Sequence, residues 1–206
     1  MSTLAQLAAH VVSYYDDQRT TDLAYSDRIA QVTAMGSEIL DEVAQYAEWD
    51  FLYKKANLTF TSGQNYISLP SDFLSMPSQG KVIRPDHTIL EPVTLDEVIQ
   101  LREDSYAGPP EVYAITYQIE LTTVPAGSAG TGSIYYQCSP TETTNVPLAF
   151  HNAVILQGMI ARALEAKGEA TPYYQKYRFN LAEMQRRLRS GKNRVNRIPM
   201  VNPDMY

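Results

Sequence analysis

Residues 49–60, WDFLYKKANLTF, mark the point where the spacing of apolar residues changes from a helical period to a strand period. Upstream, apolar side chains recur three or four residues apart from Ile29 to Ala47, which predicts a helix that ends near Trp49. From Phe51 onward the period is two, which predicts a strand with one face formed by Leu52, Lys54, Ala56, Leu58 and Phe60. The chain therefore passes from a helical part into a β-rich part at this point.

The residues after this strand predict more strands. Residues 61–65 predict a turn, and Tyr66–Leu69 predicts the partner strand of residues 51–60. Pro70 ends that pairing because it has no N–H to donate. Further strands are predicted at 80–84, 88–92, 112–116, 118–123 and 133–138, with a flexible loop at 126–132.

Helices are predicted on the N-terminal side of this region and once within it. Residues 3–15 carry apolar side chains at helical spacing, and Ser26 is the expected N-cap of the helix that ends near Trp49. The sequence Thr94-Leu95-Asp96-Glu97 is a capping box, which predicts a short helix to about Glu103.

The C-terminal part predicts two more helices. An apolar helix follows Pro147 and stops at Gly168, and Thr171-Pro172 begins the last helix as N-cap and first helical residue. Nothing is periodic after Ser190, so residues 190–206 are predicted to form an extended tail. The last helix has a seam with alternating spacings of three and four, formed by Tyr174, Tyr177, Leu181, Met184 and Leu188.

The predicted fold class is α+β. The N- and C-terminal helices form a helical bundle, a small β-rich subdomain is inserted between them, and an extended C-terminal arm follows. The predicted boundaries are 1–50 for the N-terminal helices, 51–146 for the β-rich insertion, 147–189 for the C-terminal helices and 190–206 for the basic tail.

Charge is distributed unevenly along the chain. The net charge of −6 argues against a general nucleic-acid binder. Six basic residues and no acidic residue lie between Arg186 and Arg197, so the rest of the chain, with 11 basic and 23 acidic residues, carries −12. No apolar run is long enough for a membrane span and no secretory signal is evident, so a soluble protein without membrane contact is expected.

No residue pattern predicts catalysis, a metal site or a cofactor. His10, His87 and His151 lack metal-ligand spacing, and the lone Cys138 is expected to be buried and inert. The glycine-rich residues 127–133 lack a following lysine and helix, so a mobile hairpin loop is expected there instead of a phosphate site. The acidic pairs at 16–17, 96–97 and 103–104 fit helix ends and loops.

Two features indicate interaction surfaces. The 15 tyrosines suit either surfaces that become buried on association or ordinary half-buried packing. The basic run fits a docking arm for an acidic protein surface or for passing DNA, although a helix C-terminus also favours its first residues. This docking-arm hypothesis comprises Arg186, Arg187, Arg189, Lys192, Arg194, Arg197 and Tyr206.

Short motifs follow one another in a recognisable order. A helix ending in Trp49-Asp50-Phe51-Leu52 leads into a strand, and Phe150-His151 later precedes a helix containing Ala163-Leu164-Glu165. Between them stand Gly63, Tyr66, Leu69, Pro70, Asp72 and Phe73. Across roughly residues 25–190, this order resembles the head-to-tail adaptor proteins of tailed phages, the connector family beneath the portal of short-tailed phages.

The resemblance implies a structural protein and not an enzyme. Copies are expected to form a dodecameric ring that docks on the portal protein, extends the DNA channel and receives a tail nozzle or other distal tail protein. Viral DNA would pass through without sequence-specific binding. The expected location is the virion neck, with the host cytoplasm as the place of assembly. Residues 190–206 match, in position and character, an arm that family members extend along the portal's outer wall.

Three alternative functions stay open at this stage. One is a different neck component, such as a tail-completion or nozzle protein. Another is a peptidoglycan-degrading muramidase that acts during DNA delivery. The third is a DNA-binding regulator that uses the basic run from Arg186 to Arg197.

Overall fold

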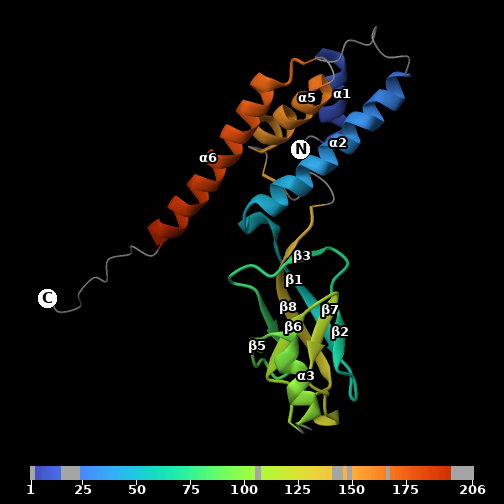
Figure 1. Ribbon diagram of the computed structural model, residues 1–206, viewed down its shortest axis with the longest axis vertical. Helices are drawn as coiled ribbons and strands as arrows, with labels where there is room; N and C mark the ends of the chain where they lie inside the picture. The colour runs from blue at the N-terminus through green and yellow to red at the C-terminus, as the bar shows by residue number, and fades with distance from the viewer. Residues whose placement is uncertain are drawn as a thin grey trace, which may run out of the picture. The chain divides into compact units, whose positions relative to one another are not determined.

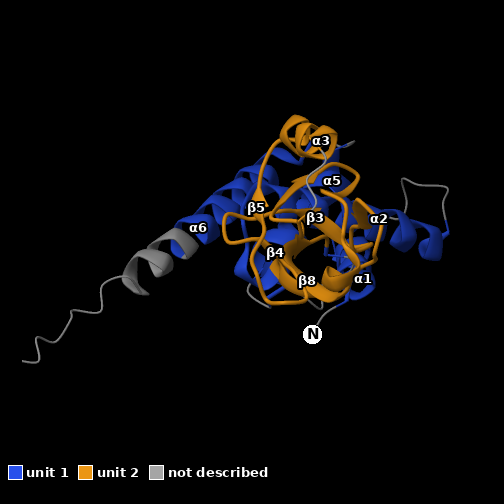
Figure 2. Cartoon of the chain, turned by 90° about the horizontal axis from the view of Figure 1, so that it is seen from below, with its two compact units in different colours: residues 1–51, 140–206 blue, residues 52–139 orange. Residues whose placement is uncertain are grey.

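The computed structural model describes residues 3–14, 24–104, 108–140, 146–147, 150–165 and 168–195, with side chains as far as residue 187 (Figure 1). The chain divides into two compact units (Figure 2). Unit 1 combines Met1–Phe51 with Pro140–Tyr206, and unit 2 is Leu52–Ser139. Unit 1 is helical and unit 2 holds the strands, so the predicted α+β fold class is confirmed.

Unit 1 is a bundle of helices from both ends of the chain (Figure 1). The central helix α5 contacts α1, α2 and α6, and it is the most completely buried of the four. The residues predicted from helical spacing form the buried faces of α1 and α2, apart from the half-buried Ile29 and Ala47 and from Tyr15, which lies outside the described residues. The elements are α1 (Leu4–Tyr14), α2 (Tyr25–Tyr46), the π-helical segment η5 (His151–Ile155), α5 (Leu156–Leu164) and α6 (Thr171–Val195).

The π-helical start of α5 is supported by a side chain from α6. A π-helical turn breaks the regular ladder of backbone hydrogen bonds, so its carbonyl groups need other donors. The Asn180 side-chain amide donates to the Ala153 carbonyl oxygen at 2.6 Å. On the predicted seam of α6, Tyr177 and Leu181 are buried and Tyr174 and Met184 are half-buried, whereas the side chain of Leu188 lies outside the described part of the structure.

Several predicted helix ends were wrong. Helix α2 begins at Tyr25, so Ser26 is not its N-cap; its hydroxyl lies 3.4 Å from an Asp27 carboxylate oxygen. The same helix ends at Tyr46 and not near Trp49, because Ala47 adopts an extended backbone.

Helix α6 starts and ends differently from the prediction. Thr171 is its first helical residue and not its N-cap, and the helix runs to Val195, past the predicted end at residue 190. A glycine such as Gly191 weakens a helix by about 1 kcal/mol without having to end it. Basic side chains in the following turn are favoured by the helix dipole.

Among its described residues, unit 2 contains two four-stranded sheets and one α-helix. In the first sheet, β8 pairs with β1, β3 and β4; in the second, the strand order is β2-β7-β6-β5. Strands β1 and β8 pair antiparallel over their length, from Tyr53 opposite Gln137 to Phe60 opposite Gly130. The elements are β1 (Tyr53–Phe60), β2 (Tyr66–Ser68), β3 (Phe73–Ser75), β4 (Lys81–Ile83), β5 (Glu91–Pro92), α3 (Leu95–Glu103), β6 (Val112–Ile115), β7 (Gln118–Leu121) and β8 (Gly130–Cys138).

The predicted hairpin between residues 51–60 and 66–69 was wrong. Strand β2 pairs with β7 in the second sheet, and β1 pairs with β8 in the first. The intervening turn is held by Val124, whose carbonyl accepts from the Gly63 N–H and whose N–H donates to the Gln64 carbonyl, both at 2.9 Å. These bonds direct the chain from one sheet into the other.

The predicted mobile loop at 126–132 was also wrong. A short 3-10 turn at Ala126–Ser128 leads directly into β8, which begins at Gly130. A Cβ atom at Gly132 would lie 2.3 Å from the Ile83 carbonyl oxygen and 2.5 Å from the Phe60 ring. The glycine therefore permits close packing of a strand and does not form part of a flexible loop.

Helix α3 matches its prediction and anchors the second sheet. The Thr94 hydroxyl accepts from the Glu97 N–H at 3.3 Å and the Glu97 carboxylate accepts from the Thr94 N–H at 2.8 Å, which completes the capping box. From the last turn of this helix, the Arg102 guanidinium donates to the Glu120 carboxylate and to the carbonyls of Leu121 and Asn65, each at 2.7 Å. One side chain thus joins α3, β7 and the turn before β2.

Replacing Arg102 with methionine is expected to destabilise unit 2 by about 2 kcal/mol, the usual size for hydrogen bonds to a charged group. Burial raises the pKa of Glu120, but bonds from Arg102 and Gln118 outweigh it and hold the pKa below 4.5. The stabilisation is therefore present above that pH and is lost as the pH falls through the folded-state pKa. Chemical denaturation should show a smaller difference between wild type and variant in acid than at neutral pH. A difference independent of pH would contradict this assignment.

Candidate interaction surfaces

The two sequence motifs that border the helical part meet in one aromatic cluster within unit 1. Trp49 is 2% exposed, and its indole N–H donates to the Val43 carbonyl at 2.5 Å. Its ring centroid lies 5.6 Å from that of Phe51 and 5.0 Å from that of Phe150, and the two phenylalanine rings are 5.2 Å apart. The cluster joins residues about 100 positions apart in the chain and so has a structural role.

A second group of residues from the motifs that resemble the adaptor family surrounds Asp72 in unit 2. The Asp72 carboxylate accepts from the Lys54 ammonium and from the Tyr136 hydroxyl, each at 2.5 Å. Burial opposes ionisation, but these hydrogen bonds hold the pKa of Asp72 below its ordinary value. Burial and the neighbouring carboxylate raise the pKa of Tyr136. Phe73 stacks on Tyr136 with ring centroids 5.7 Å apart, so this group also holds the fold together.

Of the remaining motif residues, Tyr66 lines a groove between β1 and β2, and Gly63, Leu69 and Pro70 lie in the chain before and after β2. Gly63 occupies the turn with φ +80°, a conformation that favours glycine. Tyr66 is exposed on β2, and Leu69 and Pro70 are half-buried beyond it. The groove has a volume of about 400 Å³ and is lined by uncharged residues, namely Asn57, Leu58, Thr59, Thr61, Gln64, Tyr66, Ile67 and Ser68.

The basic run begins on an ordinary helix surface. Arg186 and Arg187 both form ion pairs with Glu183 of the same helix, at 2.8 and 3.1 Å. Such exposed pairs contribute little to stability and fit the interpretation of a solvated helix face for these two residues. The backbone of Arg189, Lys192 and Arg194 belongs to α6, whereas Arg197 and Tyr206 lie outside the described residues.

A surface that the sequence did not reveal lies on the first sheet. Lys55 of β1 and Lys81 of β4 both pair across from Tyr135 of β8. Their ammonium groups lie 5.4 and 5.1 Å from the centroid of its ring, and the Tyr53 ring lies 6.1 Å from it. We call these four residues the lysine–tyrosine platform. Only the strand pairing brings them together, because no sequence spacing relates residues 55, 81 and 135.

The described histidines occupy structural positions. His10 is exposed and its ring lies 4.7 Å from that of Tyr14, whereas His87 lies in a turn with φ +67°. His151 is fully buried, with its Nε2 atom 3.0 Å from the Val146 carbonyl oxygen. Within the described ranges, no three His, Cys, Asp or Glu residues gather in a way that could hold a metal ion.

The other residues considered for catalysis are Cys138 and the acidic pairs, and those that the structure describes also lie in structural positions. Cys138 is buried at the end of β8, and burial raises the pKa of its thiol. The acidic pairs at 96–97 and 103–104 lie at the two ends of α3, whereas 16–17 lies outside the described residues. No helix in the described part of the chain is long and apolar enough to cross a membrane.

Comparison with known protein families decides the relationship of this chain. A family model described as SU10 adaptor protein matches residues 2–198. The chain belongs to the SU10 adaptor protein family. This is a family of phage head–tail adaptors, so the resemblance inferred from the sequence motifs is confirmed. A comparison of this chain with curated proteins found no match. The family match spans both compact units, so unit 2 belongs to the adaptor as much as the helices do.

Proposed function

We propose that this adaptor is a structural component of the phage neck that joins the portal to the tail. Copies form a ring, which we infer to be dodecameric, beneath the portal protein. The ring extends the DNA channel and provides the attachment site for a tail nozzle or another distal tail protein. The adaptor acts in the virion and assembles in the host cytoplasm. The observation that carries this proposal is the family match over residues 2–198.

The C-terminal helix supports the docking-arm part of the proposal. Helix α6 is 25 residues long, whereas η5 and α5 together span His151–Leu164. A helix rises about 1.5 Å per residue, so α6 is much longer than η5 and α5 together. Its last turns, which carry the basic run, therefore extend beyond these two segments. Glu183 forms ion pairs with both Arg186 and Arg187 and offsets one of their two positive charges, and no acidic residue follows until Asp204. The residues best suited to an acidic partner are therefore Arg189, Lys192, Arg194 and Arg197.

The charge of the rest of the chain supports passage of DNA without capture. Residues outside the basic run carry −12. Affinity for a DNA duplex comes mainly from basic side chains that contact phosphate groups. A ring built mostly from acidic surface would let DNA slide, and it gives no basis for sequence-specific binding.

Deleting residues 191–206 is expected to weaken binding to isolated portal rings at least tenfold, because it removes half of the basic run. Repeated weak contacts around a ring multiply the effect of losing one contact per copy. Binding is measured by co-sedimentation of adaptor with portal rings, and electron microscopy of the mixture shows whether a dodecameric ring forms. A shorter deletion of residues 198–206 keeps every basic residue and serves as the matched control.

Two outcomes would decide against the proposal in different ways. Full affinity after removal of residues 191–206 excludes the docking arm. Binding of the intact chain to tail tube components, with none to portal, instead supports a different neck protein.

A further inference from the structure

Lys55 and Lys81 are the two basic residues of the lysine–tyrosine platform, and their charges set it apart from the rest of unit 2. Unit 2 has five basic residues, and three of them pair with acids: Lys54 with Asp72, Arg84 with Asp86 and Arg102 with Glu120. Lys55 and Lys81 have no carboxylate partner among the residues that the structure describes. Both charges lie against one tyrosine ring.

The position of these lysines makes them available to a partner. Lys55 is exposed, Lys81 and Tyr135 are half-buried, and Tyr53 is 38% exposed. Like charges that share one ring repel each other, and an anionic partner removes that repulsion. The platform therefore combines aromatic area with a local excess of positive charge, although unit 2 as a whole has five basic and nine acidic residues.

Helix α3 of the same unit combines exposed aliphatic side chains with negative charge. Its single buried residue is Val98, and its outer surface exposes Leu95 and Ile99 at 38% and 39%. Asp96 and Glu103 are exposed beside this aliphatic pair, and neither has an ion-pair partner among the described residues. We call these four residues the α3 face. Aliphatic area at its centre and carboxylates beside it match the tyrosines and lysines of the platform.

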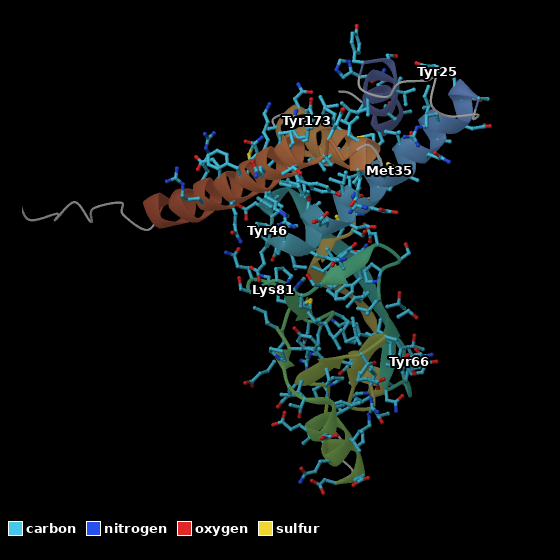
Figure 3. All side chains as sticks on the ribbon, turned by 45° about the horizontal axis from the view of Figure 1, so that its top comes forward. Tyr25, Met35, Tyr46, Tyr66, Lys81 and Tyr173 are labelled. Atoms are coloured by element: carbon cyan, nitrogen blue, oxygen red, sulfur yellow. The ribbon has the colours of Figure 1, made fainter. Side chains whose placement is uncertain are left out.

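We propose that the lysine–tyrosine platform of one copy docks on the α3 face of a second copy. The inference rests on the proposed ring and supplies one of its interfaces. Two different surfaces of one chain make a head-to-tail contact, which generates a ring when the rotation closes. Figure 3 labels Lys81, one of the platform lysines, on unit 2. DNA is the weaker candidate partner, because two lysines in a unit with an acidic excess give little affinity for phosphate.

A charge exchange tests this pairing. One variant carries K55E and K81E, and a second carries D96K and E103K. Within either variant, the two surfaces have the same sign of charge and repel. When the two variants are mixed, every platform faces an α3 face of opposite sign, so alternating contacts form. The matched control is K176E with R178E, which changes the same number of exposed charges on α6 of unit 1.

Self-association is measured by sedimentation equilibrium up to millimolar concentration, and thermal unfolding confirms that each variant is folded. Wild type and control are expected to associate equally. Each charge-reversal variant alone should associate at least tenfold more weakly, and the equimolar mixture should recover wild-type association. Amide NMR shifts of one labelled variant, on addition of the other, should be confined to the platform and α3.

Several results would overturn the proposal. These are a wild type that stays monomeric at millimolar concentration, charge-reversal variants that associate as strongly as wild type, and a mixture that associates no better than its components. A loss of duplex DNA binding in K55E/K81E without loss of self-association would assign the platform to DNA. Portal binding is measured separately, so failure of this interface is distinguishable from failure of the proposed function.

Discussion

Substitution of Trp49 by alanine is expected to destabilise unit 1 by about 4 kcal/mol, the size found when a large aromatic side chain is removed from a packed core. Trp49 is 2% exposed and contacts two other rings, so its loss leaves a cavity and breaks a three-ring cluster. The indole hydrogen bond to the Val43 carbonyl is lost as well. Chemical denaturation followed by helical circular dichroism measures the change, because the helical bundle lies in unit 1.

Trp49→Phe is the matched control. It keeps an aromatic ring in the cluster and removes the indole N–H, so a loss of about 1–2 kcal/mol is expected. Equal losses for the alanine and phenylalanine variants would assign the effect to the hydrogen bond and not to packing.

Substitution of Gly132 by alanine is expected to destabilise unit 2 by about 3 kcal/mol. A methyl group here would overlap the Ile83 carbonyl oxygen at 2.3 Å and the Phe60 ring at 2.5 Å. The first of these is a backbone atom of the neighbouring strand, so relief requires the sheet itself to shift, and overpacking of this kind costs at least about 1–3 kcal/mol. Hydrogen exchange of the amides in β1, β4 and β8 measures the loss of local stability.

Gly127 provides the comparison for Gly132. A Cβ atom at this position would have nothing within 4 Å, so Gly127→Ala should change stability by less than about 0.5 kcal/mol. The single tryptophan, Trp49, reports on unit 1. Its fluorescence should therefore respond to neither glycine substitution under conditions where unit 2 is folded. Equal destabilisation by both alanines would show that Gly132 is not specially packed.

Local signals in the sequence predicted most helices but not the strand pairing. The capping box at Thr94 acts within one turn of chain, so its residues suffice to place the start of α3, whereas α5 ends at Leu164, before the predicted stop at Gly168. The pairing of β2 with β7 depends on Val124, about 60 residues from the turn at Gly63 that it holds. No local pattern contains that information.

The residues of the candidate surfaces were likewise predictable only where a local sequence motif contains them. The motif residues Trp49, Phe51, Asp72 and Phe73 were recognisable in order, and the structure gives all four contacts that explain them. The lysine–tyrosine platform could not be predicted, because it exists only when β1, β4 and β8 lie side by side. The glycines of residues 127–133 were misinterpreted, since a glycine needed for tight packing and one in a flexible loop look alike in sequence.

The pairing of β1 with β8 has a consequence for how unit 2 is connected to the rest of the chain. The chain enters unit 2 at Leu52 and leaves it at Ser139, and Tyr53 and Gln137 are direct cross-strand neighbours. Antiparallel neighbours have Cα atoms about 5 Å apart. Both covalent connections of unit 2 therefore lie within one strand spacing of each other. Because these two ends are neighbours, a short linker could replace unit 2 without separating the two chain ends that it joins in unit 1.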